Sequence, residues 1–317
     1  MNFRTEIPVK KYPFEINHQS KILFLGSCFS DNISQKLIDG GFSVTANPFG
    51  VLYNPISIKN AFDILIKNKS FEEKDLIQNH GLYHSFSHHG SFSKTTKEET
   101  LHLINTSINK HQDLLNKSSV IFITLGTAYV YRYLETKEIV SNCHKIPAKE
   151  FEHFALSVNE IVQEYKPLLK QLKANNSNIK IVFTVSPVRH WKDGAHKNQL
   201  SKASLHLAIA ELQNQFDFVD YYPSYELIMD DLRDYRFYTK DLIHINTQAI
   251  DYIYEHFQKN FYSEETQKIE KQVLKLKRAL NHRPFNHNTK EHMAFVRKTQ
   301  EQINLFKQKF PEISFKH

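Results

Sequence analysis

The feature that most restricts the fold of this chain is a short apolar run, which ends in Gly-Ser-Cys and leads directly into a helical pattern. Residues 22–25 (Ile-Leu-Phe-Leu) are continuously apolar, as expected for a strand buried on both faces. Gly26 permits a tight turn after them. Ser30 and Asp31 can cap a helix that follows at once, with an apolar face of Ile33, Leu37 and Ile38. A strand, a tight turn and a helix in this order indicate an open α/β sheet.

The turn itself is where we expect the chemistry. Ligands of open α/β sheets bind at the carboxyl ends of the strands, and a helix N-terminus there favours negative charge. Ser27 and Cys28 are therefore candidate nucleophiles, although the same residues also suit an ordinary turn with a buried thiol. Asp241 and His244 lie three residues apart, just before another helical pattern. A carboxylate in that position can orient an imidazole base, as in a nucleophile–base–orienter set.

The rest of the chain repeats the alternation of strands and helices. Further strands are predicted at residues 42–46, 119–125, 180–185 and 218–221. This alternation predicts an α/β fold with a parallel, doubly wound sheet. We expect one such domain over residues 1–259 and a charged helical extension over 260–317, interrupted at 283–288. The extension is expected to pack against the domain or against a partner chain, so the sequence also allows a homo-oligomer.

Local signals predict several element boundaries. Three S/T-x-x-E patterns, beginning at Ser70, Thr96 and Ser157, predict helix N-termini. Pro167 is expected to kink or shorten the helix that starts after Ser157. Residues 128–141 have the pattern of a small hairpin inserted after the third strand.

Composition and charge narrow the class of protein. Hydrophobic residues make up 40% of the 317 residues and charged residues 24%, which is ordinary globular usage. The net charge of +7 is spread along the chain, so we expect no nucleic-acid partner. No apolar run is long enough for a membrane span, and the N-terminal residues lack a signal-peptide pattern. Two cysteines form no disulfide framework and no CxxC zinc pattern, so we expect a cytoplasmic protein without a membrane partner.

Small or polar residues also follow the other predicted strands, at 47–50, 126–127 and 186–189. Because parallel strands point the same way, these ends should meet the Gly-Ser-Cys turn at one edge of the sheet. Gly50 and Gly126 are candidate backbone donors to an oxyanion, though each also suits a plain turn. Arg189 can clamp a carboxylate or phosphate with its planar fork, or pair with a nearby acid.

A loop rich in histidine and aromatic residues, at 81–93, is too long and irregular for a simple connector. We expect it to cover the Cys28/His244 edge and to contribute His84, Ser85 or His89 to a ligand surface. A metal site is the less favoured alternative, because no zinc signature is present. Its ligands would come from His84, His88, His89, Cys143 and His144.

These residues resemble the GSCFA family, named after a motif that is written here as residues 26–30, Gly-Ser-Cys-Phe-Ser. The likeness covers most of residues 21–257 and extends through NPFGVLYNP, GLYHSFSHHGSFS, LGTAYVYR, NCHKIP, SPVRH, Asn198-Gln199-x-Ser201-Lys202 and DLIH. The family is similar to the SGNH (GDSL-like) hydrolases, which are three-layer, flavodoxin-like esterases, lipases and carbohydrate O-acyl hydrolases. The resemblance implies sheet order 2-1-3-4-5, a nucleophile in the first motif, Asp241 and His244 as the D-x-x-H pair, and no cofactor. It also implies a small-molecule or carbohydrate ester as substrate.

The chain departs from the SGNH pattern at two places. Aligning Gly-Asp-Ser with Gly-Ser-Cys puts Cys28 at the nucleophile position and Ser27 where the aspartate would stand. The segment 126–129, Gly-Thr-Ala-Tyr, lacks the oxyanion-hole asparagine, which leaves Asn54 or Asn47 as replacements. Two functions are compatible with these residues: an ester hydrolase or acyltransferase with a covalent acyl-enzyme intermediate, or a ligand-binding protein without turnover. We favour Cys28 as the nucleophile, held as a thiolate by the helix N-terminus and the histidine, over Ser27.

Overall fold

A five-stranded parallel sheet forms the centre of the computed structural model, which describes residues 4–282 and 289–315. The spatial order β2-β1-β5-β9-β10 confirms the expected 2-1-3-4-5 order for the five strands of this sheet. Their bounds are Lys21–Gly26 (β1), Ser43–Ala46 (β2), Val120–Leu125 (β5), Lys180–Val185 (β9) and Val219–Tyr221 (β10).

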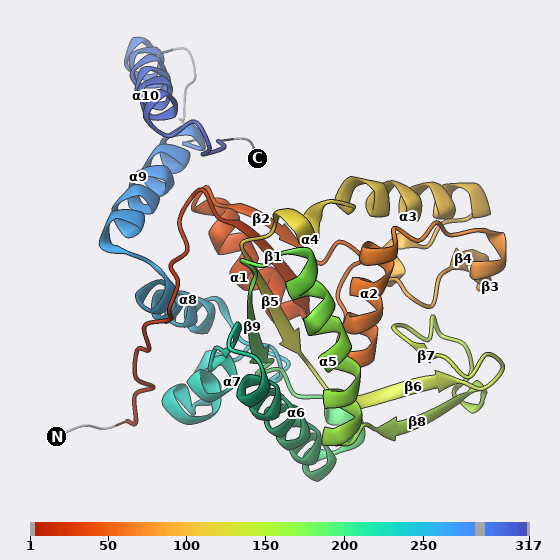
Figure 1. Ribbon diagram of the computed structural model, residues 1–317. Coiled ribbons are helices and arrows are strands. Elements are labelled where there is room, and N and C mark those ends of the chain that lie inside the picture. The colour runs from red at the N-terminus through yellow and green to blue at the C-terminus, as the bar shows by residue number, and fades with distance from the viewer. Residues whose placement is uncertain (1–3, 283–288, 316–317) are drawn as a thin grey trace.

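Helices cover both faces of this sheet, which gives the three layers of an α/β fold (Figure 1). One face carries α1 (Cys28–Asp39) and α8 (Thr247–Phe261), while the other carries α2 (Pro55–Lys67), α5 (Val158–Asn175) and α6 (Ala195–Gln215). The strands divide their side chains between the two cores with period two: in β1, Leu23 and Leu25 face one core while Ile22 and Phe24 face the other. The continuous apolar strand pattern therefore reflects burial on both faces.

Smaller elements are inserted at the carboxyl edge. The predicted hairpin exists as β6 (Tyr129–Tyr133) and β7 (Ile139–Val140), and an unpredicted strand, β8 (Phe151–Ala155), completes a three-stranded sheet. The histidine-rich loop contains a strand as well, since β3 (Ile77–Asn79) pairs with β4 (Leu82–His84). The remaining elements between β4 and α8 are α3 (Lys97–His111), α4 (Leu114–Lys117), α7 (Ser224–Glu226), a π-helical turn at Leu227–Leu232 and short 3₁₀ turns.

Several predicted helix ends differ from those observed. The first helix begins at Cys28, so its N-cap is Ser27 and not Ser30 or Asp31. No helix is capped by Ser70, because the following 3₁₀ turn uses Glu72 as its N-cap. Thr96 caps α3, and Ser157 forms a full capping box with Glu160. Pro167 lies inside α5 without shortening it.

The C-terminal extension is helical, as expected, in α9 (Glu264–Leu280) and α10 (Lys290–Lys309). It is attached to the main domain through the buried Glu270, which accepts hydrogen bonds from Tyr254 and Gln258 of α8. Val273 and Ile313 pack against Gly41, and the remainder of the extension reaches away from the sheet (Figure 1). The predicted interruption at 283–288 lies outside the described residues. Among the described helices, none combines the length and apolarity that a membrane crossing would need.

Candidate active site

The turn after β1 is determined by a close backbone approach at Gly26. Its φ is +142°, and a Cβ atom there would lie 2.2 Å from the carbonyl oxygen of Thr124 on β5. The next N–H, that of Ser27, donates to the same carbonyl at 3.2 Å. Only glycine fits this position, and the chain can therefore enter α1 directly after the strand.

The two candidate nucleophiles differ in exposure. Ser27 is 1% exposed, and its Oγ has no hydrogen-bond partner among the described residues. Cys28 is the first residue of α1 and is partly exposed. Because a substrate must be able to reach the nucleophile, the accessible side chain of Cys28 is the better candidate at this turn.

The thiol of Cys28 is not held as a thiolate, contrary to the sequence-based expectation. Burial and the carboxylate of Asp31 raise its pKa, and these effects outweigh the N–H groups of Cys28 and Phe29 and the charge of Lys202, which lower it. At neutral pH the group is therefore a thiol, and a base must remove its proton during any attack.

Asp241 and His244 form the expected pair. Nδ1 of His244 lies 2.7 Å from Oδ2 of Asp241, and Oδ1 accepts hydrogen bonds from Thr239 Oγ1 and from the N–H groups of Ile243 and His244. These four donors hold the pKa of Asp241 well below its usual range, with the His244 side chain contributing most. The carboxylate therefore fixes the imidazole through Nδ1 and leaves Nε2 for another partner, on a side chain that is 53% exposed.

His244 makes no hydrogen bond to Ser27 or Cys28 within the described part of the chain. Two residues to which sequence reasoning assigned no role, His190 and Lys202, lie within electrostatic range of these groups. Burial lowers the pKa of His190 to about 4, with further lowering by Lys202 and His244. Since Lys202 also acts on Cys28, these four side chains share one electrostatic site at the carboxyl edge of the sheet.

Lys202 is the central cation of this edge. It is 1% exposed, and its Nζ donates to the carbonyl oxygens of Gly126 (2.6 Å), Ser186 (2.6 Å) and Val188 (2.9 Å). The bonds tie the end of β5 to the end of β9. Burial lowers the pKa of Lys202 to about 7, and the charge of Arg189 lowers it further. The three carbonyl acceptors nevertheless match the three N–H bonds of an ammonium group. The sequence marked Lys202 only as part of the Asn198-Gln199-x-Ser201-Lys202 stretch, because a lysine on the buried face of α6 is not expected from its residue type.

The proposed oxyanion donors have other acceptors. The Gly126 N–H donates to the carbonyl of Tyr53 at 2.7 Å, and the Gly50 N–H donates to that of Asn47 at 2.8 Å. Neither N–H is free for a substrate, which argues against the role expected for these glycines. Asn47 is also engaged, since its Nδ2 donates to Asp31 at 2.6 Å and its Oδ1 accepts from Gly26.

Two kinds of donor among the described residues stay candidates for that role. Oδ1 of Asn54 caps α2 by accepting from Ser57 N–H, which leaves the Nδ2 group of Asn54 as its side-chain donor. The N–H groups of Cys28 and Phe29 lie close enough to the Cys28 sulfur to lower its pKa, so they also lie where an oxyanion at that sulfur would form.

The histidine-rich loop contributes one side chain near this edge. His89 lies against Gly50 and close enough to Asp31 to lower the pKa of that carboxyl, although burial keeps the pKa raised overall. His84 is occupied internally, with its two ring nitrogens near Ser93 Oγ and the Asn79 carbonyl. Ser85 accepts from Ser87 N–H and contacts His88. The expected ligand surface is therefore reduced to His89.

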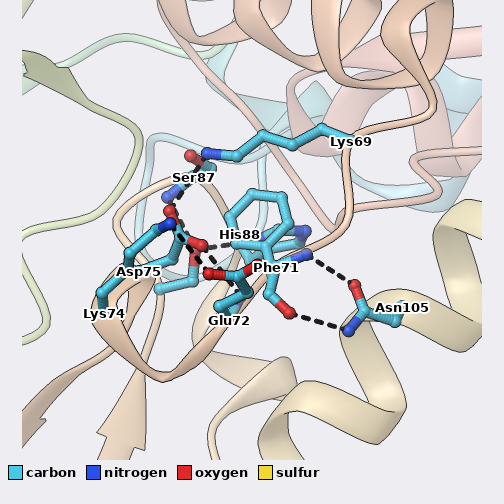
Figure 2. Close-up of polar contacts among 9 residues, drawn as sticks. Lys69, Phe71, Glu72, Lys74, Asp75, Ser87, His88 and Asn105 are labelled. Atoms are coloured by element: carbon cyan, nitrogen blue, oxygen red, sulfur yellow. Dashed lines mark hydrogen bonds and ion pairs between the residues drawn. The ribbon is translucent and has the colours of Figure 1, made fainter.

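His88 and His144 have structural surroundings. His88 is buried among Phe49, Phe71 and Phe92, and Figure 2 shows its ring beside Phe71, whose backbone is bonded to Asn105. His144 stacks on His84 and contacts the Ser85 carbonyl at 2.8 Å. In the residues that the structure describes, no cluster of three His, Cys, Asp or Glu side chains has the geometry of a metal site.

The sheet order and the Gly-Ser-Cys turn define an α/β protein with its candidate site at the carboxyl edge of a parallel sheet. The chain belongs to the GSCFA family, whose model matches residues 21–257. A second model, the C-terminal domain of GSCFA domain proteins, matches residues 273–317. Among curated proteins, none matches the chain significantly.

Several solved structures are similar in outline. A "putative acylhydrolase" from Bacteroides fragilis is 13% identical, with a TM-score of 0.40 over 82% of this chain and 91% of that chain. A "putative GDSL-like lipase" from Parabacteroides merdae is 13% identical, with a TM-score of 0.41 over 84% and 100%. A carbohydrate esterase of family 3 from Talaromyces cellulolyticus is 10% identical, with a TM-score of 0.34 over 80% and 98%.

Proposed function

We propose that this protein is an ester hydrolase or acyltransferase that works through an acyl-enzyme intermediate on Cys28. The observation that carries the proposal is the Asp241–His244 pair, in which the carboxylate fixes Nδ1 and leaves Nε2 as the base. A family whose signature spans the Cys28 turn supports the same assignment.

The proposed reaction has two stages. The Cys28 sulfur attacks the ester carbonyl carbon while its proton passes to His244 Nε2, and N–H groups at the start of α1 stabilise the oxyanion. The carbon–oxygen bond to the alcohol then breaks, and His244 returns the proton to the leaving oxygen. In the second stage His244 deprotonates water, or an acceptor alcohol, which attacks the thioester and releases Cys28 as a thiol.

The raised pKa of Cys28 makes the base a requirement of this scheme. A thiolate at rest would not need His244 for the first step, whereas a thiol does. Because both cysteines are free, we also propose that the protein works in a reducing compartment such as the cytoplasm. A small-molecule or carbohydrate ester is the proposed substrate, and self-association through the helical extension is a further proposal.

A ligand-binding protein without turnover is the second candidate. Two observations favour it: the absence of a hydrogen bond between His244 and Cys28 within the described residues, and the engagement of the Gly50 and Gly126 N–H groups. Such a protein would hold an ester at this edge without forming an acyl adduct.

An ester assay combined with mass spectrometry separates the two candidates. The wild type, incubated with chromogenic esters of varied chain length, should show turnover and a transient acyl mass on the peptide that contains Cys28. Cys28→Ala and His244→Ala should each lose at least about 100-fold in kcat/KM, because a nucleophile and its base act as one unit.

Ser27→Ala is the matched control, since Ser27 is the neighbouring residue and its Oγ has no partner among the described residues. It should retain most of the activity. If Ser27→Ala is inactive while Cys28→Ala is not, the nucleophile is Ser27. If the wild type forms no acyl adduct and hydrolyses none of the esters, the binding function replaces the enzymatic one.

A further inference from the structure

A pocket beside the Asp241–His244 pair contains an arginine that forms no ion pair within the described residues. Its volume is about 190 Å³, which suits one small group of a ligand rather than a whole drug-sized molecule. Its walls come from the loop after β9 and from the segment before α8. Lining residues include Arg189, Trp191, Met229, Arg233, Tyr238 and Leu242.

Arg189 is half-buried in the loop after β9. Its guanidinium lies 5.7 Å from the ring centre of Trp191, and Nη2 lies 3.5 Å from the sulfur of Met229. Neither neighbour carries a negative charge, and no carboxylate in the described residues forms an ion pair with Arg189. A partly buried guanidinium with free N–H groups is suited to a bidentate anion.

The charges around the pocket favour the same ligand. Arg233 is a second cation of the lining and has no ion-pair partner in the part of the chain that the structure describes. Asp234 is the acidic lining residue, and its carboxylate is already bonded to Arg236 at 2.9 Å. Within the described residues, the pocket therefore presents two unpaired positive groups against one neutralised negative group.

The position of the pocket connects it to the proposed chemistry. Leu242 and Tyr238 line it, and the same short segment carries Asp241 and His244, with Thr239 N–H bonded to the His244 carbonyl at 2.7 Å. A group bound at Arg189 would thus lie next to the proposed base.

We infer that the Arg189 pocket binds an anionic group of the substrate, a carboxylate or a phosphate, so that the natural ester carries a negative charge near its scissile bond. This inference rests on the proposed ester chemistry for its meaning, but anion binding can be measured without turnover. The apolar and aromatic wall of Trp191 and Leu242 suits a hydrocarbon portion joined to the charged group.

Trp191 is the single tryptophan of the chain, so its fluorescence reports on this pocket. The full-length protein is titrated with succinate and with inorganic phosphate, and with succinamide as the neutral match, at constant ionic strength, while calorimetry measures binding in parallel. We expect saturable binding of succinate or phosphate and none of succinamide. Preference for succinate over phosphate identifies a carboxylate, and the reverse preference identifies a phosphate.

Arg189→Gln should weaken anion binding at least about tenfold, the loss expected for one charge-assisted contact. Arg189→Lys keeps the charge and should retain part of the phosphate affinity, which keeps the test valid if Arg189→Gln folds poorly. Arg278→Gln on the remote helix α9 changes the net charge equally and should bind like the wild type. Unchanged binding in both Arg189 variants, or equal binding of succinamide, overturns the inference.

Ester turnover distinguishes this inference from the proposed function. Hydrolysis of neutral acyl esters, without preference for acyl esters that carry a separate carboxylate or phosphate group, would reject the anion site and leave the enzyme intact. Anion binding by a protein that never hydrolyses an ester would reject the enzyme and leave the site intact.

Discussion

At the scale of single residues, the reactivity of Cys28 depends on charges placed around a partly buried thiol. Asp31 lies in the first turn of the same helix and raises the pKa of Cys28, while Lys202 lowers it. Asp31 is held in place by Asn47 Nδ2 at 2.6 Å. The position of one carboxylate therefore helps to keep the sulfur protonated.

Asp31→Asn should accelerate alkylation of Cys28 by iodoacetamide at neutral pH. Removal of the negative charge lowers the thiol pKa and so increases the thiolate fraction at neutral pH. Because nucleophilicity falls with pKa, the rate should rise by less than the thiolate fraction does. The rate is measured by mass spectrometry of the peptide that contains Cys28, over a range of pH.

Asp39→Asn removes the same charge from the far end of α1 and serves as the control. It should alkylate at the wild-type rate. Cys143 offers an internal reference, because it is partly exposed like Cys28 and burial raises its pKa to about 11. It should therefore react more slowly than Cys28 in every variant. An unchanged Cys28 rate in Asp31→Asn would show that burial alone sets the pKa.

At the scale of elements, two identical sequence patterns have different outcomes. Ser157 Oγ accepts from the N–H of Glu160 at 3.2 Å, and Glu160 accepts from the Ser157 N–H at 2.8 Å, which caps α5. Ser70 starts the same S-x-x-E pattern but is exposed and caps no helix among the described residues. Ser157→Ala should therefore lower the free energy of unfolding by about 1 kcal/mol, as for other N-cap deletions.

Ser70→Ala is the sequence-matched comparison and should change stability by less than about 0.5 kcal/mol, as for ordinary surface substitutions. Urea unfolding of the two variants gives both values. Equal losses of unfolding free energy in the two variants would mean that the S-x-x-E pattern acts on the unfolded chain and not through the cap of α5.

The difference between these two patterns could be predicted from the residues downstream of each serine. After Ser157 a buried face recurs at Ile161, Tyr165, Leu168 and Leu172, which anchors a long helix to the sheet. The segment after Ser70 has no such face, and only a 3₁₀ turn forms. Strands were predicted from the same periodicity, whereas β8 was missed because Phe151–Ala155 is mostly exposed and pairs only with β6 among the described strands.

At the scale of the whole molecule, the sequence predicts where the candidate site lies but not which hydrogen bonds its residues form. Parallel strands bring the Cys28 turn and the β9 end to one edge, and the D-x-x-H spacing sufficed to pair Asp241 with His244. The acceptors of the Gly50 and Gly126 N–H groups depend on the path of the loop after β2, which no local pattern specifies. Lysine is rarely buried, so the role of Lys202 required the three carbonyls that surround it.

Acid stability is a property of the whole molecule to which the buried histidines contribute. Burial lowers the pKa of His88 to about 3, and it lowers those of His144, His190 and His206 to about 4. The pKa of a histidine in the unfolded chain is about 6.5. Below that pH the unfolded chain binds protons that the folded chain does not, so stability is full above about pH 6.5 and falls with decreasing pH.

His88→Leu should reduce this acid dependence by one proton. Each such group contributes a slope of up to about 1.4 kcal/mol per pH unit, and His88 is the most deeply buried of the four. The free energy of unfolding, measured in urea at several values between about pH 6.5 and about pH 4, should therefore fall less steeply in His88→Leu than in the wild type. His102→Leu, at an exposed position of α3, controls for the loss of a histidine and should keep the wild-type slope. The quantity compared is the slope of the unfolding free energy against pH, so loss of the contact between His88 and Ser85 does not affect the comparison. Equal slopes in all three proteins would contradict the burial of a neutral His88.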